Sequence, residues 1–165
     1  MNTKLNMVIS IKGIHLTSSY DHNMLDQWKQ DISNWDNPSS RDMALDAINT
    51  LPEYTLLACI DSYGQLLGAA SYLFMSRNEM DLLPDTYTES FGPQNLYYAL
   101  KDNGMIHVSY IGANGRGAGS QIMGKLISMS HASKKPLMLH AVGGSNSFYA
   151  SLGLDHQGDD FFYVP

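Results

Sequence analysis

The sequence predicts a mixed α/β (α+β) protein in which helices cover both faces of a central sheet. Short apolar runs alternate along the chain with amphipathic segments of helical period, and two consecutive apolar runs form a hairpin. A strand–helix–strand unit at residues 105–142 should also place its two strands parallel. This mixture of elements is typical of a sheet with helices packed against it.

The first third of the chain predicts one strand and two helices. Residues 7–11 form a short apolar run that is typical of a strand. Apolar residues then recur at spacings of three and four, which predicts one helical face: Leu25, Trp28, Ile32 and Trp35. Ser39 with Asp42 resembles a capping box and should open a second helix, which Pro52 ends.

The middle of the chain predicts a hairpin and a long insert. Residues 54–60 and 66–75 are apolar runs joined by the turn-forming residues 61–64. The insert, residues 77–104, is too long for a plain connection, so we expect it to be functional. Its aromatic and acidic side chains suit an amine-bearing ligand or a contact in a homodimer: Glu79, Asp81, Asp85, Tyr87, Glu89, Phe91, Tyr97 and Tyr98.

The C-terminal part predicts alternating strands and helices. An apolar strand at residues 105–111 is followed by a glycine-dense turn and a helix from residue 120 to about residue 130. A strand at 137–142, a short helix at 145–152 and a closing strand at 161–164 complete the chain.

Size and charge narrow the class of protein. A chain of 165 residues with 44% hydrophobic and 16% charged residues is expected to form one globular domain. Its formal net charge of −6 disfavours binding to nucleic acid or to an anionic membrane, because phosphates would be repelled. The same charge is compatible with a cationic substrate such as an amine.

The cysteine and histidine usage indicates the compartment and argues against a metal site. The one cysteine, Cys59, lies in an apolar run and should be a buried thiol, which fits a reducing compartment. No apolar run is long enough to span a membrane, and residues 1–5 lack the apolar region of a secretory signal. We therefore expect a cytoplasmic protein. The six histidines show no metal-binding spacing.

The glycine-dense turn is the strongest functional signal in the sequence. Five of the 14 glycines fall between Gly112 and Gly124, where a strand passes through a turn into a helix. Such a turn points backbone N–H groups at one spot, and the helix dipole adds positive charge there, so it predicts a phosphate or pyrophosphate site. A P-loop lysine is missing, and Lys134 and Lys135 stand where a dinucleotide-binding unit would need an acidic residue.

Two motifs resemble the GNAT family of acetyl-CoA-dependent N-acetyltransferases. The family carries [QR]-x-x-G-x-[GA] at its strand-to-helix turn, and residues 114–119 read Asn-Gly-Arg-Gly-Ala-Gly, with Asn in place of Gln or Arg. Residues 148–154, Phe-Tyr-Ala-Ser-Leu-Gly-Leu, are similar to the family's aromatic–Tyr motif in the last short helix. The family's Asn seven positions before that Tyr is Val142 here, and Asn146 lies nearby.

The resemblance implies a fold, a cofactor and a set of site residues. The fold would be a GNAT-like, mixed but mostly antiparallel central sheet with helices on both faces, in a single domain at 1–165 with the insert at about 77–104. Tyr149 would be the general acid, and His107 or His140 the base that accepts a proton from the amine. Acetyl-CoA would contact the turn, the strand before it and the last short helix: Asn114, Gly115, Arg116, Gly117, Ala118, Gly119, Ser120, Ser109, Tyr110, Ile111 and Asn146.

The implied activity is direct transfer of an acetyl group from acetyl-CoA to a primary amine. The acceptor would be a small molecule or a protein, and the charge of −6 disfavours a nucleic acid. An alternative is a GNAT-like module that binds acyl-CoA or a partner protein without turnover. No carboxylate is present in the strand at residues 105–111, which keeps that alternative open.

Overall fold

The computed structural model describes residues 10–14, 22–51, 53–76, 104–115, 117–142, 145–157 and 160–165. The predicted insert at 77–104 lies outside these residues except for Gly104. The chain divides into two compact units, one of residues 1–72 and 110–123 and the other of residues 73–109 and 124–165. Organisation as a single domain stays a prediction.

The elements follow a mixed order, and the strands of the described residues form one seven-stranded sheet with the order β1-β2-β3-β4-β5-β7-β6. The elements are β1 (Ser10–Ile14), α1 (His22–Ser33), α2 (Pro38–Asn49), β2 (Thr55–Ile60), β3 (Leu66–Met75), β4 (Met105–Ala113), α6 (Ala118–Ser133), β5 (Leu137–His140), α7 (Asn146–Ser151), β6 (Asp155–Gln157) and β7 (Asp160–Tyr163). β4 and β5 are parallel, whereas β1–β2, β2–β3, β5–β7 and β6–β7 are antiparallel. The predicted mixed, mostly antiparallel sheet is confirmed.

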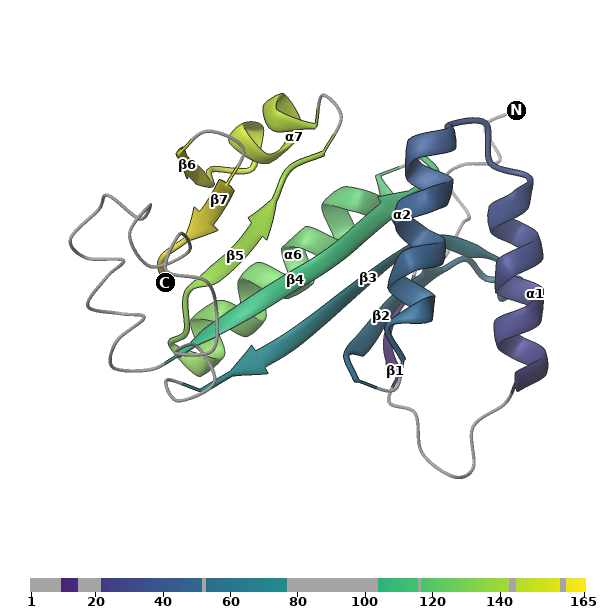
Figure 1. Ribbon diagram of the computed structural model, residues 1–165, viewed down its shortest axis with the longest axis horizontal. Helices are drawn as coiled ribbons and strands as arrows, with labels where there is room; N and C mark the ends of the chain where they lie inside the picture. Colours follow the sequence, from purple (N-terminus) through teal and green to yellow (C-terminus); the bar gives the residue numbers. More distant parts are fainter. Residues whose placement is uncertain are drawn as a thin grey trace. The chain divides into compact units, whose positions relative to one another are not determined.

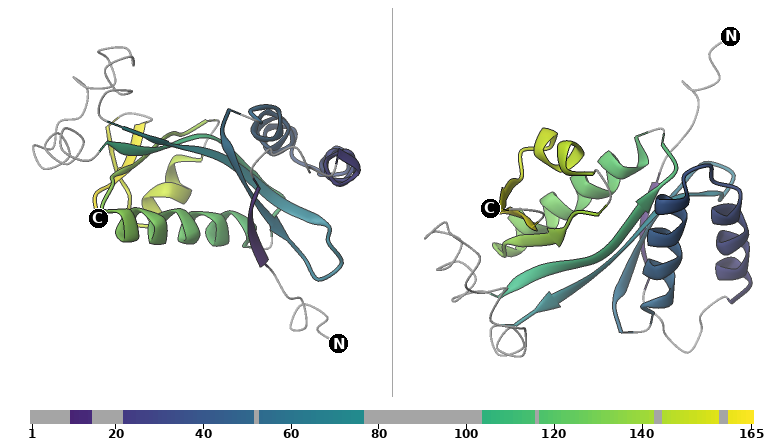
Figure 2. Two further views of the ribbon diagram at one scale, coloured as in Figure 1. Left: turned by 90° about the horizontal axis from the view of Figure 1, so that it is seen from below. Right: turned by 45° about the horizontal axis from the view of Figure 1, so that its top comes forward.

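In the first unit, α1 and α2 lie side by side on one face of the strands β1–β3 (Figures 1 and 2). Alternate residues of β2 point at these helices because side chains of a strand alternate between its two faces. The resulting core contains Leu25, Trp28, Ile32, Trp35, Ala44, Ala47, Ile48, Leu56, Ala58, Ile60, Leu66 and Ala69. The helical face predicted from Leu25 to Trp35 is therefore the face that is buried.

The β2–β3 hairpin forms at the predicted residues and is bonded to α1. The Asp61 carboxylate accepts hydrogen bonds from the N–H groups of Tyr63 and Gln65 at 2.8 and 3.0 Å, which closes the turn. The indole N–H of Trp28 donates to the carbonyl of Gly64 at 3.3 Å. These contacts hold the end of the hairpin against the helix.

The start of α2 differs from the prediction. Asn37, rather than Ser39, caps the helix, because its side-chain oxygen accepts a hydrogen bond from the N–H of Ser40 at 3.1 Å. Pro38 takes the first helical position, where its missing N–H costs nothing. The capping box expected from Ser39 and Asp42 was wrong, since both residues already lie inside the helix.

The beginning of α6 covers the opposite face of the first unit (Figure 2). A Cβ atom placed on Gly68 of β3 would lie 2.9 Å from Cδ1 of Ile122 and 3.3 Å from Cβ of Ala113. Cys59, the register partner of Gly68, is buried as expected, and burial raises the pKa of its thiol to about 11. Helices on both faces of the sheet are thus observed within this unit.

The second unit is built on the pairing of β5, β7 and β6 (Figure 1). β6 was not predicted; it is only three residues long and pairs with β7 in a short hairpin. Methionine and aromatic side chains form the small core of this unit: Met75, Met105, Met138 and Phe162. The abundant methionines therefore serve, at least here, as core residues.

Several boundaries moved by a few residues. The predicted first strand at 7–11 lies partly outside the described residues, and β1 is described from Ser10 to Ile14. β4 continues to Ala113, and α6 begins at Ala118 and ends at Ser133. β5 ends at His140. The helices of the described segments are too short or too polar to cross a lipid bilayer.

Gly112 of β4 allows α2 to approach the strand closely. A Cβ atom at this position would lie 2.3 Å from the carbonyl oxygen of Ser40 and 2.7 Å from the backbone nitrogen of Ala44. Both atoms belong to the backbone of α2, so a side chain can be accommodated only if the helix moves away.

The variant Gly112→Ala should therefore be destabilised, by about 1–3 kcal/mol, because it overpacks a backbone contact. Gly124→Ala is the matched control, since no heavy atom lies within 4 Å of its added Cβ. Alanine in a helix should stabilise that position by roughly 0.5–1 kcal/mol. Urea unfolding measures both values, and equal stability of the two variants would contradict the close contact.

Candidate active site

The glycine turn between β4 and α6 contains two residues in the left-handed region. Gly115 has φ +64° and Gly117 has φ +79°, a conformation that strains residues with a side chain. Arg116, the predicted phosphate contact between them, lies outside the described residues. These two glycines let the chain pass from the strand into the helix within a few residues.

Backbone hydrogen bonds hold the turn on both sides. The N–H of Asn114 donates to the carbonyl of Leu67 at 2.9 Å. Leu67 is the additional residue where the β2–β3 register shifts between Cys59 and Ile60. On the helix side, the N–H groups of Ala118 and Gln121 donate to the carbonyls of Gly115 and Gly117 at 3.2 and 3.0 Å.

The outer surface of the turn is accessible to a ligand. Asn114, Gly115, Gly117 and Ser120 are exposed, Gly119 is half-buried, and Ala118 is buried beneath them. A Cβ atom added at Gly115 or Gly117 would meet no heavy atom within 4 Å. The first turn of α6 has no acidic residue, so no carboxylate of that turn opposes an anion at the positive end of the helix dipole.

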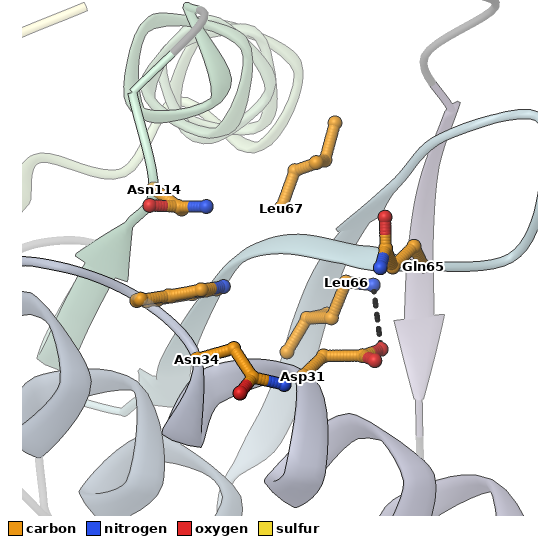
Figure 3. Close-up of a pocket in the computed structure, with 7 residues that line it drawn as sticks. Asp31, Asn34, Gln65, Leu66, Leu67 and Asn114 are labelled. Atoms are coloured by element: carbon orange, nitrogen blue, oxygen red, sulfur yellow. Dashed lines mark hydrogen bonds between the residues drawn. The ribbon is translucent and has the colours of Figure 1, made fainter.

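A small pocket of about 140 Å³ adjoins the turn on the side of α1 (Figure 3). Its lining residues are Asp31, Asn34, Trp35, Gln65, Leu66, Leu67 and Asn114. The Asp31 carboxylate accepts hydrogen bonds from the N–H of Leu66 at 3.1 Å and from the Gln27 amide at 3.2 Å. Because the lining includes a carboxylate and no basic residue, this pocket is unsuited to a phosphate group.

The three predicted residues at the end of β4 are all half-buried. Tyr110 packs against the core between β2, β3 and the helices α1 and α2. Ser109 belongs to the second unit, whereas Tyr110 and Ile111 belong to the first. In the second unit, the parallel register of β4 with β5 covers Ile106–Val108 and Leu137–Leu139.

Two histidines of the second unit share one face of its strands. His107 of β4 is the register partner of Met138 of β5, and His140 lies two residues beyond Met138. Residues two apart on a strand point to the same face, so His107 and His140 do as well. The strands on which they lie are neighbours, as the sequence predicted.

The two imidazoles differ in their surroundings. His107 is half-buried, and burial lowers the pKa of its imidazole, which favours the neutral form. The side chain of His140 is 59% exposed, and its Nδ1 lies 2.9 Å from the Oδ1 of Asp160 on β7. Asp160 was not among the predicted site residues, because an antiparallel register between distant segments cannot be read from the sequence.

Tyr149 is held rigidly in the second unit. It is 4% exposed, and its ring centroid lies 5.4 Å from that of Phe161 and 5.2 Å from that of Phe148. Burial raises the pKa of its phenol to about 12, so the hydroxyl keeps its proton throughout the neutral range. Asn146, the other predicted residue of α7, is half-buried at the first position of the helix.

Burial of His107 predicts a specific loss of stability in acid. The folded state holds this imidazole below its ordinary pKa of 6.5, whereas the unfolded chain protonates it normally. The stabilising contribution is therefore present above pH 6.5 and lost as the pH falls below it.

The variant His107→Gln should accordingly lose less free energy of unfolding than the wild type between pH 7.5 and pH 5. Urea unfolding at pH 7.5 and pH 5 gives the free energy of unfolding of both proteins. Titrating groups that the two proteins share contribute equally and cancel when the two losses are compared. His131→Gln, at an exposed histidine of α6, is the control for the loss of an imidazole as such. An identical acid loss in wild type and His107→Gln would contradict the burial argument.

Comparisons with known proteins place the fold but not the family. No protein-family model and no curated protein matches the sequence. A mutant of the toxin AtaT, bound to the C-terminus of the antitoxin AtaR and to acetyl-CoA, is similar in structure with a TM-score of 0.58. The two sequences are 13% identical, and the match covers 96% of this chain and 93% of that one.

Two further solved structures have the same fold. AtaT in complex with acetyl-methionyl-tRNAfMet matches with a TM-score of 0.52 and 14% identity over 95% of each chain. The polyamine N-acetyltransferase of Drosophila melanogaster, which forms N-acetylagmatine, matches with a TM-score of 0.53 and 10% identity. That match covers 94% of this chain and 100% of the other. The chain therefore has the fold of GNAT acetyltransferases.

Proposed function

We propose that this protein is an N-acetyltransferase that uses acetyl-CoA as acetyl donor. The observation that carries the proposal is the exposed glycine turn at the start of α6, in a fold shared with acetyltransferases. Acetyl-CoA is present in one of the similar structures, that of the AtaT mutant. Among the described residues, no group of three or more His, Cys, Asp or Glu side chains suits a metal ion.

The turn would bind the pyrophosphate of acetyl-CoA. Gly115 and Gly117 keep the surface free of side chains, and the first amides of α6 would donate to the phosphate oxygens. Gly119 and Ser120 would supply those amides, whereas Ala118 is buried beneath them and its N–H donates to the carbonyl of Gly115, and Arg116 would add a positive charge. Asn114 would position the turn through its bond to β3 rather than through its side chain.

The end of β4 would hold the thioester. The parallel pairing of β4 with β5 ends at Val108. The backbone N–H groups that follow it belong to Ser109, Tyr110 and Ile111. Such groups can donate to the pantetheine arm and to the carbonyl oxygen of the thioester, where negative charge develops during attack. Asn146 would contribute a further polar contact to coenzyme A.

Tyr149 would serve as the general acid toward the leaving sulfur. Its phenol is protonated in the neutral range because its pKa is about 12. A thiol has a pKa of about 8.5, so the phenol stabilises the leaving thiolate mainly as a hydrogen-bond donor and water completes the protonation. The aromatic contacts with Phe148 and Phe161 would keep the hydroxyl in place.

The acceptor would be a primary amine. The acetyltransferases of similar structure include one that forms N-acetylagmatine and one bound to acetyl-methionyl-tRNAfMet. The net charge of −6 favours a small cationic amine over a nucleic acid. The insert at 77–104 remains the predicted acceptor site, and a cytoplasmic location remains a prediction.

Acetyl-CoA should stabilise the wild type against heat, and Gly119→Asp should abolish that stabilisation, because a carboxylate at the start of α6 repels the pyrophosphate. Gly124→Asp introduces the same side chain on the exposed part of the same helix and should retain the response. Differential scanning calorimetry with and without acetyl-CoA measures the shift. Equal stabilisation of Gly119→Asp and Gly124→Asp would place the cofactor elsewhere.

Removal of the Tyr149 hydroxyl should slow turnover and spare cofactor binding. Tyr149→Phe keeps the ring contacts, so kcat should fall by about 10²-fold while the Kd for acetyl-CoA changes little. Thiol release in the presence of agmatine, spermidine or methionyl-tRNA measures kcat, and calorimetry measures Kd. Unchanged turnover would return Tyr149 to a purely structural role, and acetyl-CoA binding without product would favour the non-catalytic module.

A further inference from the structure

His140 and Asp160 form a cross-strand pair at the carboxyl end of β5. The two residues are register partners in the antiparallel pair β5–β7, and His140 is the last residue of its strand. Their side chains meet through Nδ1 and Oδ1 at 2.9 Å. In open sheets with parallel strands, ligands bind outside the carboxyl ends of those strands, and β5 is parallel to β4.

The pair determines which nitrogen of His140 carries the proton. An ionised carboxylate can only accept hydrogen bonds, so the neutral imidazole must hold its proton on Nδ1. The lone pair is then on Nε2, which is the nitrogen that a general base uses. With the side chain 59% exposed, Nε2 of His140 is accessible to an incoming amine and can pass its proton to water.

The other histidines of this unit lack this combination. His107 is half-buried, and its lowered pKa makes it a weaker base. His131 is exposed, but its Nε2 contacts the hydroxyl of Tyr163, which can donate or accept and so leaves the tautomer undetermined. His156 is exposed and stacks on the ring of Phe161, at 5.0 Å between centroids.

We propose that His140 is the general base that deprotonates the acceptor amine and that Asp160 is the residue that positions it. The proposal rests on the proposed acetyltransferase function. It selects His140 over His107 as the base. Asp160 then sets the tautomer and the ring orientation of His140.

The step balances without another reactant. The acceptor ammonium first releases one proton to water and becomes the neutral amine. The amine nitrogen then forms a bond to the thioester carbonyl carbon, and Nε2 of His140 takes a second proton from that nitrogen. The bond between carbon and sulfur then breaks, and the sulfur leaves as a thiolate that accepts a hydrogen bond from Tyr149. The proton passes from His140 through water to the thiolate, which gives the acetylated amine and free coenzyme A.

A surface ion pair without a catalytic role would give different results. Such a pair stabilises a protein by about 0–1 kcal/mol, and its loss leaves kinetics alone. A general base contributes about 10²–10⁴-fold to the rate, and a small base added to the solution can replace it. Rescue by imidazole therefore separates the two roles.

The experiment measures thiol release from acetyl-CoA with the amine panel of agmatine, spermidine and methionyl-tRNA. His140→Ala should lower kcat by about 10²-fold or more, and added imidazole should restore part of the loss. Asp160→Asn should lower kcat by roughly tenfold with an unchanged KM, and Asp160→Glu should recover most of it. Mass spectrometry of the product confirms that the amine, and not imidazole, carries the acetyl group.

Two controls match the variants. His131→Ala removes another exposed histidine of the same unit that has a polar partner, and it should keep the wild-type kcat. Tyr149→Phe should gain nothing from imidazole, since it lacks a donor rather than a base. An active wild type whose His140→Ala variant keeps its kcat within twofold would overturn the inference and leave the acetyltransferase proposal intact.

A second measurement does not need turnover. Diethylpyrocarbonate modifies accessible neutral imidazoles, and acetyl-CoA should slow the labelling of His140 while leaving His131 unchanged. If calorimetry shows acetyl-CoA binding but no amine of the panel is acetylated, the acetyltransferase proposal fails. If acetyl-CoA binds but does not change the rate at which His140 is labelled, the assignment of His140 as the base is overturned, whether or not an amine is acetylated.

Discussion

A single backbone hydrogen bond, from the N–H of Asn114 to the carbonyl of Leu67, positions the glycine turn. Its acceptor, Leu67, is the additional residue of β3 at the register shift of the β2–β3 hairpin. The turn would otherwise be an exposed loop of small residues with many accessible conformations. Fixed at Asn114 and continued into α6, the turn has its conformation before any ligand arrives, which would lower the entropic cost of the proposed pyrophosphate binding.

The glycines between Gly112 and Gly124 have two separate functions. Gly115 and Gly117 supply the left-handed conformation of the turn. Gly112 instead allows the backbone of α2 to contact β4. On the other face, Gly68 of β3 leaves room for the side chains of Ala118 and Ile122 of α6. Close packing of α2 on β4 and of α6 on β3 therefore surrounds the end of β4 that leads into the glycine turn.

The second unit places its polar chemistry on a short and otherwise apolar set of strands. Phe161 and Phe162 of β7 point to opposite faces, and Phe161 holds the ring of Tyr149 while Phe162 joins the methionine core. Asp160 precedes them at the start of the strand and meets His140. Aromatic neighbours thus fix the ring of Tyr149, whereas a single hydrogen bond to Asp160 orients the exposed imidazole of His140.

The order of elements, except for the three-residue β6, and the glycine turn followed from the sequence alone, because hydrophobic periodicity and the special backbone needs of glycine are local properties. The buried Cys59 and the parallel β4–β5 unit followed for the same reason. Ser39 was expected to open α2, whereas Asn37 caps the helix because its side chain reaches the N–H of Ser40. The His140–Asp160 pair, the contact of Gly112 with α2 and the bond from Asn114 to Leu67 were decided only by the tertiary structure. Each joins segments that lie far apart in the chain, and strand register and helix packing depend on long-range contacts that no local pattern records.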